Sequence, residues 1–303
     1  MRKDGKMFMS CCAPFVVEQS YKKGCDILIS YAYKSAYETF FKLVKENGHK
    51  PLFMMDSGAY TNTSGTAGST DDKMDEYIKF VNDHDEYIDY FVQMDKIPRT
   101  ESNRTLDLRN VKEVTDYNMQ NYLYFLSKVK SPEKVVPVYH SGESFEFLDW
   151  LLDFEPQIDL IGLGLVRDDM DNVMSYLREK GVLEKRKFHI LGAGSAKVLR
   201  KVNVWSSDAS SFVRKAAYKK IPMNLVKVIE VGERRNPELF LDERQREQLS
   251  NFIHRISNVE VEDVLNDYHA RLDLWLDYYK SKEFRDFVFV GDIGNKRKNL
   301  FQF

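Results

Sequence analysis

The sequence predicts an α/β protein built as a (β/α)8 TIM barrel with a C-terminal helical extension, and three observations lead to that class. Short apolar runs alternate with helical segments along most of the 303 residues, as in parallel sheets whose strands are buried on both faces. Eight such strand–helix units can be counted, the number in this barrel. The turn after the first run, Ser30-Tyr31-Ala32-Tyr33, lacks the glycine fingerprint of a dinucleotide fold. An open doubly wound sheet remains the alternative.

The predicted strands are the apolar runs, and the predicted helices are the longer amphipathic segments between them. The strands are Ile27–Tyr31, Leu52–Asp56, Ile88–Asp95, Val135–His140, Ile158–Leu165, Phe188–Leu191, Val202–Asp208 and Leu225–Val231. The helices are Lys34–Glu46, Asp72–Asn82, Asn103–Lys128, Ser144–Asp153, Met170–Lys180, Ala196–Lys201 and Ser211–Lys219, with an eighth within Leu241–Ile256.

No strand is predicted in the chain before Ile27. Its apolar stretch Met7–Val17 faintly resembles a signal peptide, but Ser10 and Pro14 interrupt it and Asp4 precedes it. A secretory signal has a longer uninterrupted apolar region after a basic start. We therefore expect no secretion.

From Asn236 onward the sequence changes from alternating strands and helices to charged helical segments, a short strand-like run and a basic tail. These parts are Glu243–Ile256, Val261–Tyr279, Phe287–Val290 and Lys296–Leu300. We accordingly predict a catalytic barrel domain over residues 1–235, and barrel-closing helices with a helical cap and basic tail over 236–303.

Composition limits the classes of function. The hydrophobic fraction of 43% allows a sizeable core, and the net charge of −2 gives no overall basic field, so contact with nucleic acid would rest on local patches. No apolar run approaches the ~20 residues that cross a membrane. The three cysteines, Cys11, Cys12 and Cys25, have no metal-binding spacing. We expect a cytoplasmic protein with no metal and no cofactor.

Three aspartates end apolar runs that are far apart in the sequence: Asp56, Asp95 and Asp208. A parallel barrel builds its active site at the C-terminal ends of its strands. Two carboxylates placed there suggest a nucleophile and a general acid/base. The simpler interpretations are a helix N-cap for Asp208, a turn for Asp56, and surface pairing of Asp95 with Arg99 or Lys96.

Six segments resemble, in order, motifs of the tRNA-guanine transglycosylase superfamily, most closely the phage and bacterial branch related to the DpdA-like DNA 7-deazaguanine transglycosylases. They are Asp56-Ser57-Gly58-Ala59-Tyr60, Gln93-Met94-Asp95, Val138-Tyr139-His140-Ser141-Gly142-Glu143, Ile161-Gly162-Leu163-Gly164-Leu165, Ile190-Leu191-Gly192-Ala193-Gly194 and Ser207-Asp208-Ala209-Ser210-Ser211. Two departures stand out. His140 occupies the family's glutamine position, and the C-terminal zinc site of the tRNA enzymes is absent because no cysteine follows Cys25.

The resemblance implies catalytic roles for two of the aspartates. Asp208 would be the nucleophile that captures the sugar, as in retaining glycosidases. Asp56 would protonate the departing guanine and deprotonate the incoming 7-deazaguanine.

The remaining candidate site residues would bind the base. Asp95 would accept hydrogen bonds from guanine, and His140 would lie beside it. Gly162 and Gly164 would let backbone approach the base, and Tyr60 or Tyr139 would stack on it.

The expected polymer is DNA, with tRNA as the alternative, because the zinc insert of the tRNA enzymes is missing. Four basic residues follow the nucleophile motif at helical spacing: Arg214, Lys215, Lys219 and Lys220. Arg234 and Arg235 form a second basic cluster, although charged faces are often simply solvated. An N-glycosyl hydrolase and a non-catalytic partner subunit remain rival functions. A homodimer stays an open alternative, and the resemblance extends the cytoplasmic location to a phage-infected bacterial host.

Overall fold

The computed structural model describes residues 4–58, 70–97, 111–230 and 241–289, with side chains from residue 73 onward in the second range. Its strands form a parallel sheet in the order β5-β4-β3-β2-β1-β9-β8-β7-β6, beside a separate two-stranded ribbon. Helices alternate with the strands, so the fold is α/β and of the (β/α)8 TIM-barrel type, as predicted.

The strands of the parallel sheet are β1 Lys6–Ser10, β2 Asp26–Ser30, β3 Phe53–Asp56, β4 Tyr90–Val92, β5 Val135–Val136, β6 Val138–His140, β7 Leu160–Gly164, β8 Lys187–Ile190 and β9 Ser206–Ala209. The helices that alternate with them are α1 Pro14–Lys22, α2 Lys34–Asn47, α4 Thr70–Asp83, α5 Val111–Lys128, α6 Phe145–Asp153, α7 Arg167–Glu179, α8 Ala196–Val202 and α9 Ser211–Ala217.

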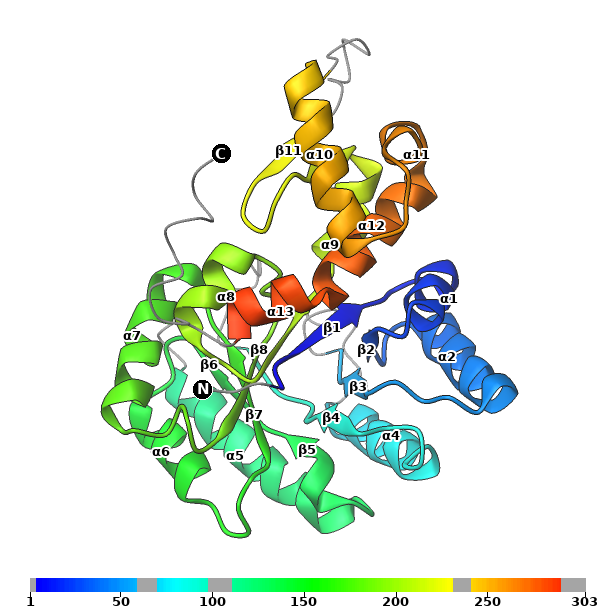
Figure 1. Cartoon of the computed structure of the whole chain (residues 1–303). Coiled ribbons are helices and arrows are strands. Elements are labelled where there is room, and N and C mark those ends of the chain that lie inside the picture. The colour runs from blue at the N-terminus through cyan, green and yellow to red at the C-terminus, as the bar shows by residue number, and fades with distance from the viewer. Residues whose placement is uncertain (1–3, 59–69, 98–110, 231–240, 290–303) are drawn as a thin grey trace. The chain divides into compact units, whose positions relative to one another are not determined.

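Two compact units make up the described chain: residues 8–192, and residues 1–7 together with 193–303. This division does not coincide with the predicted ranges 1–235 and 236–303. In the larger unit, helices α1 to α7 lie outside the strands (Figure 1). The strands are apolar on both faces, as in β2, where Ile27, Leu28 and Ile29 are at most 5% exposed.

Pro137 divides one extended segment into β5 and β6. β5 pairs with β4, through Phe91 opposite Val135, while β6 pairs with β7, through Val138 opposite Gly162. The two ends of the strand order are therefore consecutive pieces of chain. Counting β5 and β6 as one interrupted strand gives eight strands, the number that the sequence predicted, although one member of the set differs.

The sequence analysis missed one barrel strand and assigned another wrongly, at the two ends of the series. Met7–Val17 is not a single segment: it contains most of β1 and the first turn of α1, where Pro14 provides the fixed backbone angle of a first helical position. Leu225–Val231 is not a barrel strand, because β11 (Val228–Glu230) pairs antiparallel with β10 (Lys220–Pro222).

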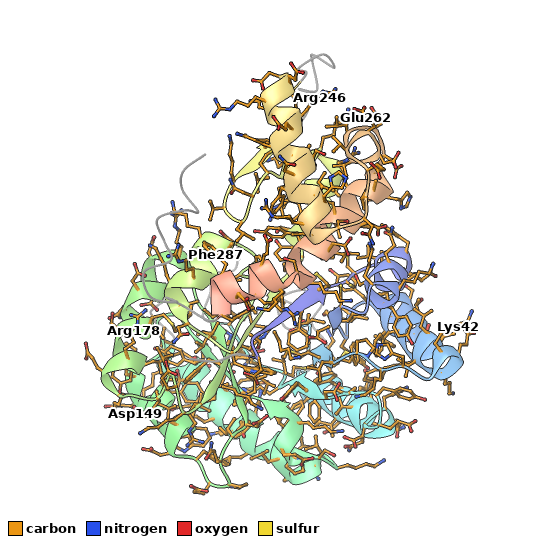
Figure 2. All side chains as sticks on the ribbon, in the orientation of Figure 1. Lys42, Asp149, Arg178, Arg246, Glu262 and Phe287 are labelled. Atoms are coloured by element: carbon orange, nitrogen blue, oxygen red, sulfur yellow. The ribbon has the colours of Figure 1, made fainter. Side chains whose placement is uncertain are left out.

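The ribbon β10–β11 and three helices enclose a small core in the second unit. These helices are α10 Glu243–Ile256, α11 Val261–Asn266 and α12 Tyr268–Lys280. The buried members of this core are Ile221, Met223, Leu249, Ile253, Val264 and Leu274. An ion pair between Arg246 and Glu262 links α10 to α11 (Figure 2).

The predicted C-terminal helices are confirmed with changes. α10 begins with a capping box formed by Asp242 and Gln245. The predicted helix Val261–Tyr279 is broken at Asp267, whose side chain caps α12. The predicted strand Phe287–Val290 is wrong, because α13 runs over Lys282–Phe289. The basic tail lies outside the described residues. None of the helices in the described ranges is long and apolar enough to cross a bilayer.

Candidate functional site

A buried cluster of three ionisable side chains lies at the C-terminal ends of β4 and β6. His140 ends β6, and its Nε2 is 2.8 Å from Oδ2 of Asp95, which follows β4. Its Nδ1 is 3.4 Å from Oε2 of Glu143, within ion-pair distance but without the alignment of a hydrogen bond. The three side chains are at most 5% exposed. The predicted residues Asp95 and His140 are therefore brought together, and Glu143 joins them.

A tight turn after β6 brings Glu143 back onto His140. Gly142 adopts a φ of 90°, a value that favours glycine, and the Glu143 N–H donates to the His140 carbonyl at 3.1 Å. This turn lets Oε2 of Glu143 accept the backbone N–H of His140 at 2.6 Å. The Glu143 carboxylate is therefore held by the backbone of His140, the residue whose ring it also faces.

Helix α5 supports the cluster with a buried polar face. Thr115 and Asn118 donate to Oε1 of Glu143 at 3.1 and 3.3 Å. Asn118 also pairs with Lys96 in both directions, through its Oδ1 and Nδ2, at 2.8 and 2.9 Å. Asn121 donates to the Met94 carbonyl at 3.1 Å. The helix thus fixes the segment after β4 and the turn after β6 to one another.

The cluster carries a charged imidazole at neutral pH. Burial opposes the charged form, but the hydrogen bond to Asp95 and the charges of Asp95 and Glu143 outweigh it and raise the pKa of His140 from 6.5 to about 9. An imidazolium between two carboxylates leaves one net negative charge in a region shielded from water. Buried ionisable groups of this kind are frequent at functional sites.

Asp56 ends β3, and the neighbouring strand β2 ends opposite it at Ser30. Its Oδ2 accepts the Gly58 N–H at 3.1 Å, which forms the turn predicted as the simpler interpretation. Burial, followed by the electrostatic effects of Asp56, Tyr31 and Asp95, raises the pKa of Tyr77 well above its usual value. Both carboxylates therefore act on one buried hydroxyl. Tyr60, expected to stack on a base, lies outside the described residues.

The two glycines of β7 do not leave open backbone for a base, contrary to the sequence interpretation. A Cβ on Gly164 would lie 2.7 Å from Cδ2 of His140. A Cβ on Gly162 would lie 3.0 Å from Cγ2 of Val138. Neighbouring side chains fill the space at both positions, so the missing Cβ atoms make room for His140 and Val138.

Tyr139 is also placed differently from the expectation. Its side chain is 1% exposed, its ring is stacked near Phe145, and its hydroxyl donates to the Glu143 carbonyl at 2.7 Å. Because successive side chains of a strand point to opposite faces, Tyr139 packs against α6 while His140 points the other way. Tyr139 is a core residue and does not offer a face to a base.

Asp208 lies in the second unit, on β9, and is 6% exposed. All four residues of this strand are buried. The residue before the first turn of α9 is Ser210, and no side chain caps that helix. The interpretation of Asp208 as a helix N-cap is therefore wrong, and the carboxylate is a buried strand residue.

The four predicted basic residues do not form one exposed patch. Arg214 and Lys219 are exposed. Lys215 instead lies over the Trp275 ring at 4.4 Å and 3.2 Å from the Tyr279 hydroxyl, and burial lowers its pKa to about 8.

Lys220 lies on the ribbon, with its Nζ 3.5 Å from a carboxylate oxygen of Glu230. The second predicted basic cluster, Arg234 and Arg235, lies outside the described residues. The surface available for nucleic acid is therefore smaller than the sequence suggested.

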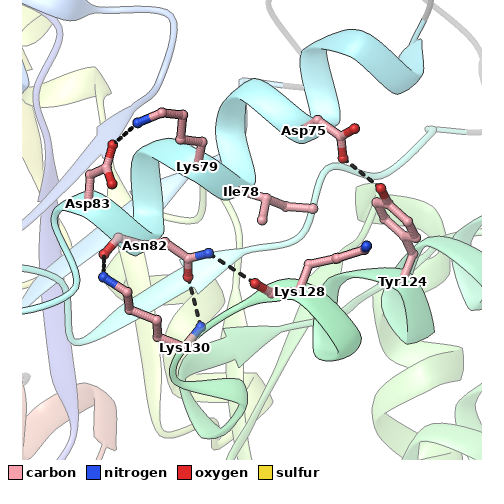
Figure 3. A pocket seen from close by; sticks show the side chains of 8 residues that line it. All are labelled: Asp75, Ile78, Lys79, Asn82, Asp83, Tyr124, Lys128 and Lys130. Atoms are coloured by element: carbon pink, nitrogen blue, oxygen red, sulfur yellow. Dashed lines mark hydrogen bonds and ion pairs between the residues drawn. The ribbon is translucent and has the colours of Figure 1, made fainter.

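A hollow of about 510 Å³ lies between α4 and α5 (Figure 3). Contacts across it join the two helices: the Tyr124 hydroxyl donates to Asp75 at 2.7 Å, and Asn82 donates to the Lys128 carbonyl at 2.9 Å. Asn82 also accepts the Lys130 N–H at 2.7 Å. These bonds hold helices together, and none of the predicted site residues lines the hollow.

Within the described ranges, no group of three or more His, Cys, Asp or Glu side chains is arranged to hold a metal ion. Burial raises the pKa of the Cys11 thiol to about 12, which makes it a poor ligand and nucleophile.

Glu143 is the functional candidate that the sequence analysis did not select, since a glutamate before a helix suggests a helix start. The signal that could have revealed it is the His-x-Gly-Glu spacing of His140 to Glu143, in which a glycine turn follows a strand end. Comparison with known proteins adds no family assignment: neither protein-family models nor curated proteins match this chain.

Proposed function

We propose that this chain is a transglycosylase that exchanges guanine for a 7-deazaguanine base in DNA through a covalent aspartyl–sugar intermediate. The observation that carries the proposal is the buried Asp95–His140–Glu143 cluster at the C-terminal strand ends. Active sites of (β/α)8 barrels are built at that end. Burying ionic groups is weak evidence for stability, because desolvation offsets much of their attraction, so a role in binding a ligand explains the cluster better.

Asp95 supports the recognition step. Its Oδ2 faces His140, and Oδ1 is the oxygen that we propose for the ligand. An ionised carboxylate only accepts hydrogen bonds, and guanine presents donors at N1 and at its exocyclic amine. A 7-deazaguanine has the same donors, because it differs from guanine at ring position 7. One acceptor can therefore serve both the departing and the incoming base.

Asp208 and Asp56 are proposed for the chemical steps. A carboxylate oxygen of Asp208 attacks C1′, the C1′–N9 bond breaks with its electron pair passing to guanine, and the Asp56 carboxyl group protonates the base. The Asp56 carboxylate then takes the proton from N9 of the 7-deazaguanine, whose nitrogen attacks C1′. The ester bond to Asp208 breaks, and both aspartates return to their starting forms.

DNA is proposed over tRNA because of the family resemblance and the missing zinc segment. Arg214 and Lys219 are the exposed members of the predicted basic set and would contact phosphates. The target guanine must leave the base stack, because an enzyme cannot reach C1′ and the base edge together in a stacked duplex.

The test is base exchange with purified full-length protein. Labelled guanine is incorporated into single-stranded DNA, duplex DNA and tRNA, and each is incubated with and without a 7-deazaguanine. We expect release of guanine from DNA with stoichiometric incorporation of the analogue, and loss of release in Asp208→Asn. Asp263→Asn, an exposed aspartate of α11, is the matched control and should keep full activity.

Each other outcome identifies a different function. Release from tRNA alone would move the substrate to RNA. Release without incorporation would indicate an N-glycosyl hydrolase that uses water. No release from any polymer would overturn the enzymatic proposal and favour a non-catalytic subunit.

A further inference from the structure

We infer that Glu143 is a positioning residue that holds His140 against Asp95, so that Asp95 keeps one oxygen directed to a hydrogen-bond-donating base. The positioning role stands on the geometry of the cluster. The identity of the ligand as guanine rests on the proposed function.

The surroundings of Glu143 show that its carboxylate acts within the protein. Oε2 accepts the His140 N–H at 2.6 Å, and Oε1 accepts from Thr115 and Asn118 at 3.1 and 3.3 Å. The side chain is 0% exposed. A carboxylate with three donors and no exposure cannot reach a substrate, so it acts through the ring that it faces.

The ring of His140 is confined on three sides. Asp95 lies 2.8 Å from Nε2, and Glu143 lies 3.4 Å from Nδ1. On the third side, Gly164 of β7 has no Cβ, and one added there would come within 2.7 Å of Cδ2. Only the imidazolium donates from both ring nitrogens. Two carboxylates facing the two nitrogens therefore favour the doubly protonated ring in one orientation.

No other charged group in the described ranges faces the ring. From α5, the side chains that reach the cluster are those of Thr115 and Asn118, which are neutral. The charge of Asp95 also acts on the buried Tyr77 hydroxyl, together with Asp56 and Tyr31, and burial keeps that hydroxyl neutral. The charge state of His140 is consequently set by Asp95 and Glu143 together.

The direct test is an NMR titration of the ring nitrogens in the full chain, with His140 assigned through backbone correlations. In the wild type we expect both ring N–H protons of His140 to be present at pH 7 and its midpoint to lie near pH 9. Glu143→Gln should lower the midpoint by at least one pH unit, a tenfold change in the acid constant. Glu146→Gln, at an exposed position of α6, should leave it unchanged.

Either of two results would overturn the positioning role: a wild-type midpoint near the ordinary 6.5 of histidine, or a midpoint that Glu143→Gln does not move. A Gln amide would meet the donors of Thr115 and Asn118 and could prevent folding. The wild-type measurement does not depend on that variant, because a missing Nδ1 proton at pH 7 contradicts the inference by itself.

A second measurement links the cluster to its ligand: calorimetric binding of free guanine between pH 7 and 8.5. We expect constant affinity in the wild type and Glu146→Gln, because His140 stays charged there. In Glu143→Gln, guanine affinity should fall severalfold across this range as the ring loses its second proton. If guanine affinity has the same pH dependence in all three proteins, the positioning role is contradicted and the proposed function is not. If guanine does not bind to any of them and the NMR titration is as expected, the proposed function is contradicted and the role of Glu143 is not.

Discussion

Among single residues, His140 gives a clear expectation of how the stability of the molecule should respond to pH. Its folded-state pKa of about 9 lies above the ordinary 6.5. A group whose pKa is higher in the folded than in the unfolded protein stabilises the folded state. This contribution is complete below the pKa of the unfolded state and is lost as the pH rises through the pKa of the folded state. The pH window for this loss is therefore 6.5 to 9.

We predict that the free energy of unfolding of the wild type falls between pH 6.5 and 9, and that His140→Gln lacks this part of the slope. Urea unfolding at pH 6 to 10 measures it. His254→Gln, at an exposed position of α10, is the control and should follow the wild type. A parallel slope in His140→Gln would show that other groups cause the dependence.

Gly164 gives a second prediction at this scale. A methyl group there would overlap Cδ2 of His140, at 2.7 Å, and overpacking of this kind destabilises by about 1–3 kcal/mol. Gly164→Ala should therefore unfold at lower urea concentration and shift the His140 ring signals. Gly162→Ala meets Val138 at 3.0 Å and should cost less. Equal losses in both variants would mean that the ring can move aside.

Among the residues selected from sequence, Asp95 was chosen because it ends an apolar run, and His140 because of the family resemblance. The structure places the two side chains in one cluster, and their roles stay predictions. Gly162, Gly164 and Tyr139 were misread because a sequence shows that a residue is small or aromatic but not which neighbour fills the space beside it. Lys215 was misread for a similar reason: nothing near it in sequence indicates the Trp275 ring that it covers.

At the scale of elements, α5 does more than cover the sheet. A helix over its range was predicted, but its polar residues Thr115, Asn118 and Asn121 are buried, whereas such residues are usually exposed. Asn118 pairs with both backbone groups of Lys96. It supplies the hydrogen bonds that a neighbouring strand would otherwise supply after β4 has ended.

We predict that Asn118→Leu destabilises the protein by about 2–3 kcal/mol, because it leaves buried hydrogen-bonding groups without partners. Amide exchange at Lys96 should also accelerate, and hydrogen-exchange NMR together with urea unfolding measures both effects. Asn172→Leu, at an exposed position of α7, is the control and should change neither. Unchanged protection of Lys96 in Asn118→Leu would mean that the segment after β4 is held by other contacts.

The strand that was missed and the strand that was wrongly assigned both depend on contacts with distant parts of the sequence. Lys6–Ser10 has only five residues and lies close to the start of the chain, where an apolar stretch has several interpretations. Val228–Glu230 has the composition of a strand, but two of its three residues are exposed. Composition predicts that a segment is extended and says nothing of which strand it pairs with.

At the scale of the whole molecule, the alternation of apolar runs and helices was sufficient to predict the barrel class. The functional proposal also depends on the charge of the whole chain. With a net charge of −2, the chain must bind a polyanion through a local basic surface. Within the part of the chain that the structure describes, Arg214 and Lys219 are the predicted basic residues that are exposed.

We predict that neutralising both residues, in Arg214→Gln with Lys219→Gln, weakens DNA binding uniformly across sequences. Each lost phosphate contact should reduce the slope of log affinity against log salt by about 1. Fluorescence anisotropy at several salt concentrations measures this slope. Lys42→Gln on α2, an exposed lysine paired within its own helix to Glu46, is the control. An unchanged slope in the double variant would place the nucleic acid elsewhere.

The interruption at Pro137 also determines how copies of this chain can associate. A sheet whose two terminal positions are consecutive pieces of one segment offers no long edge strand on which another chain could add, and exposed edges are the usual templates for aggregation. Within the described residues, the ribbon β10–β11 is the other sheet, and Val228 of β11 and Val226 of the preceding turn are exposed. Self-association through backbone pairing would therefore begin at the ribbon. We expect charged substitutions at these two valines to reduce aggregation at high protein concentration.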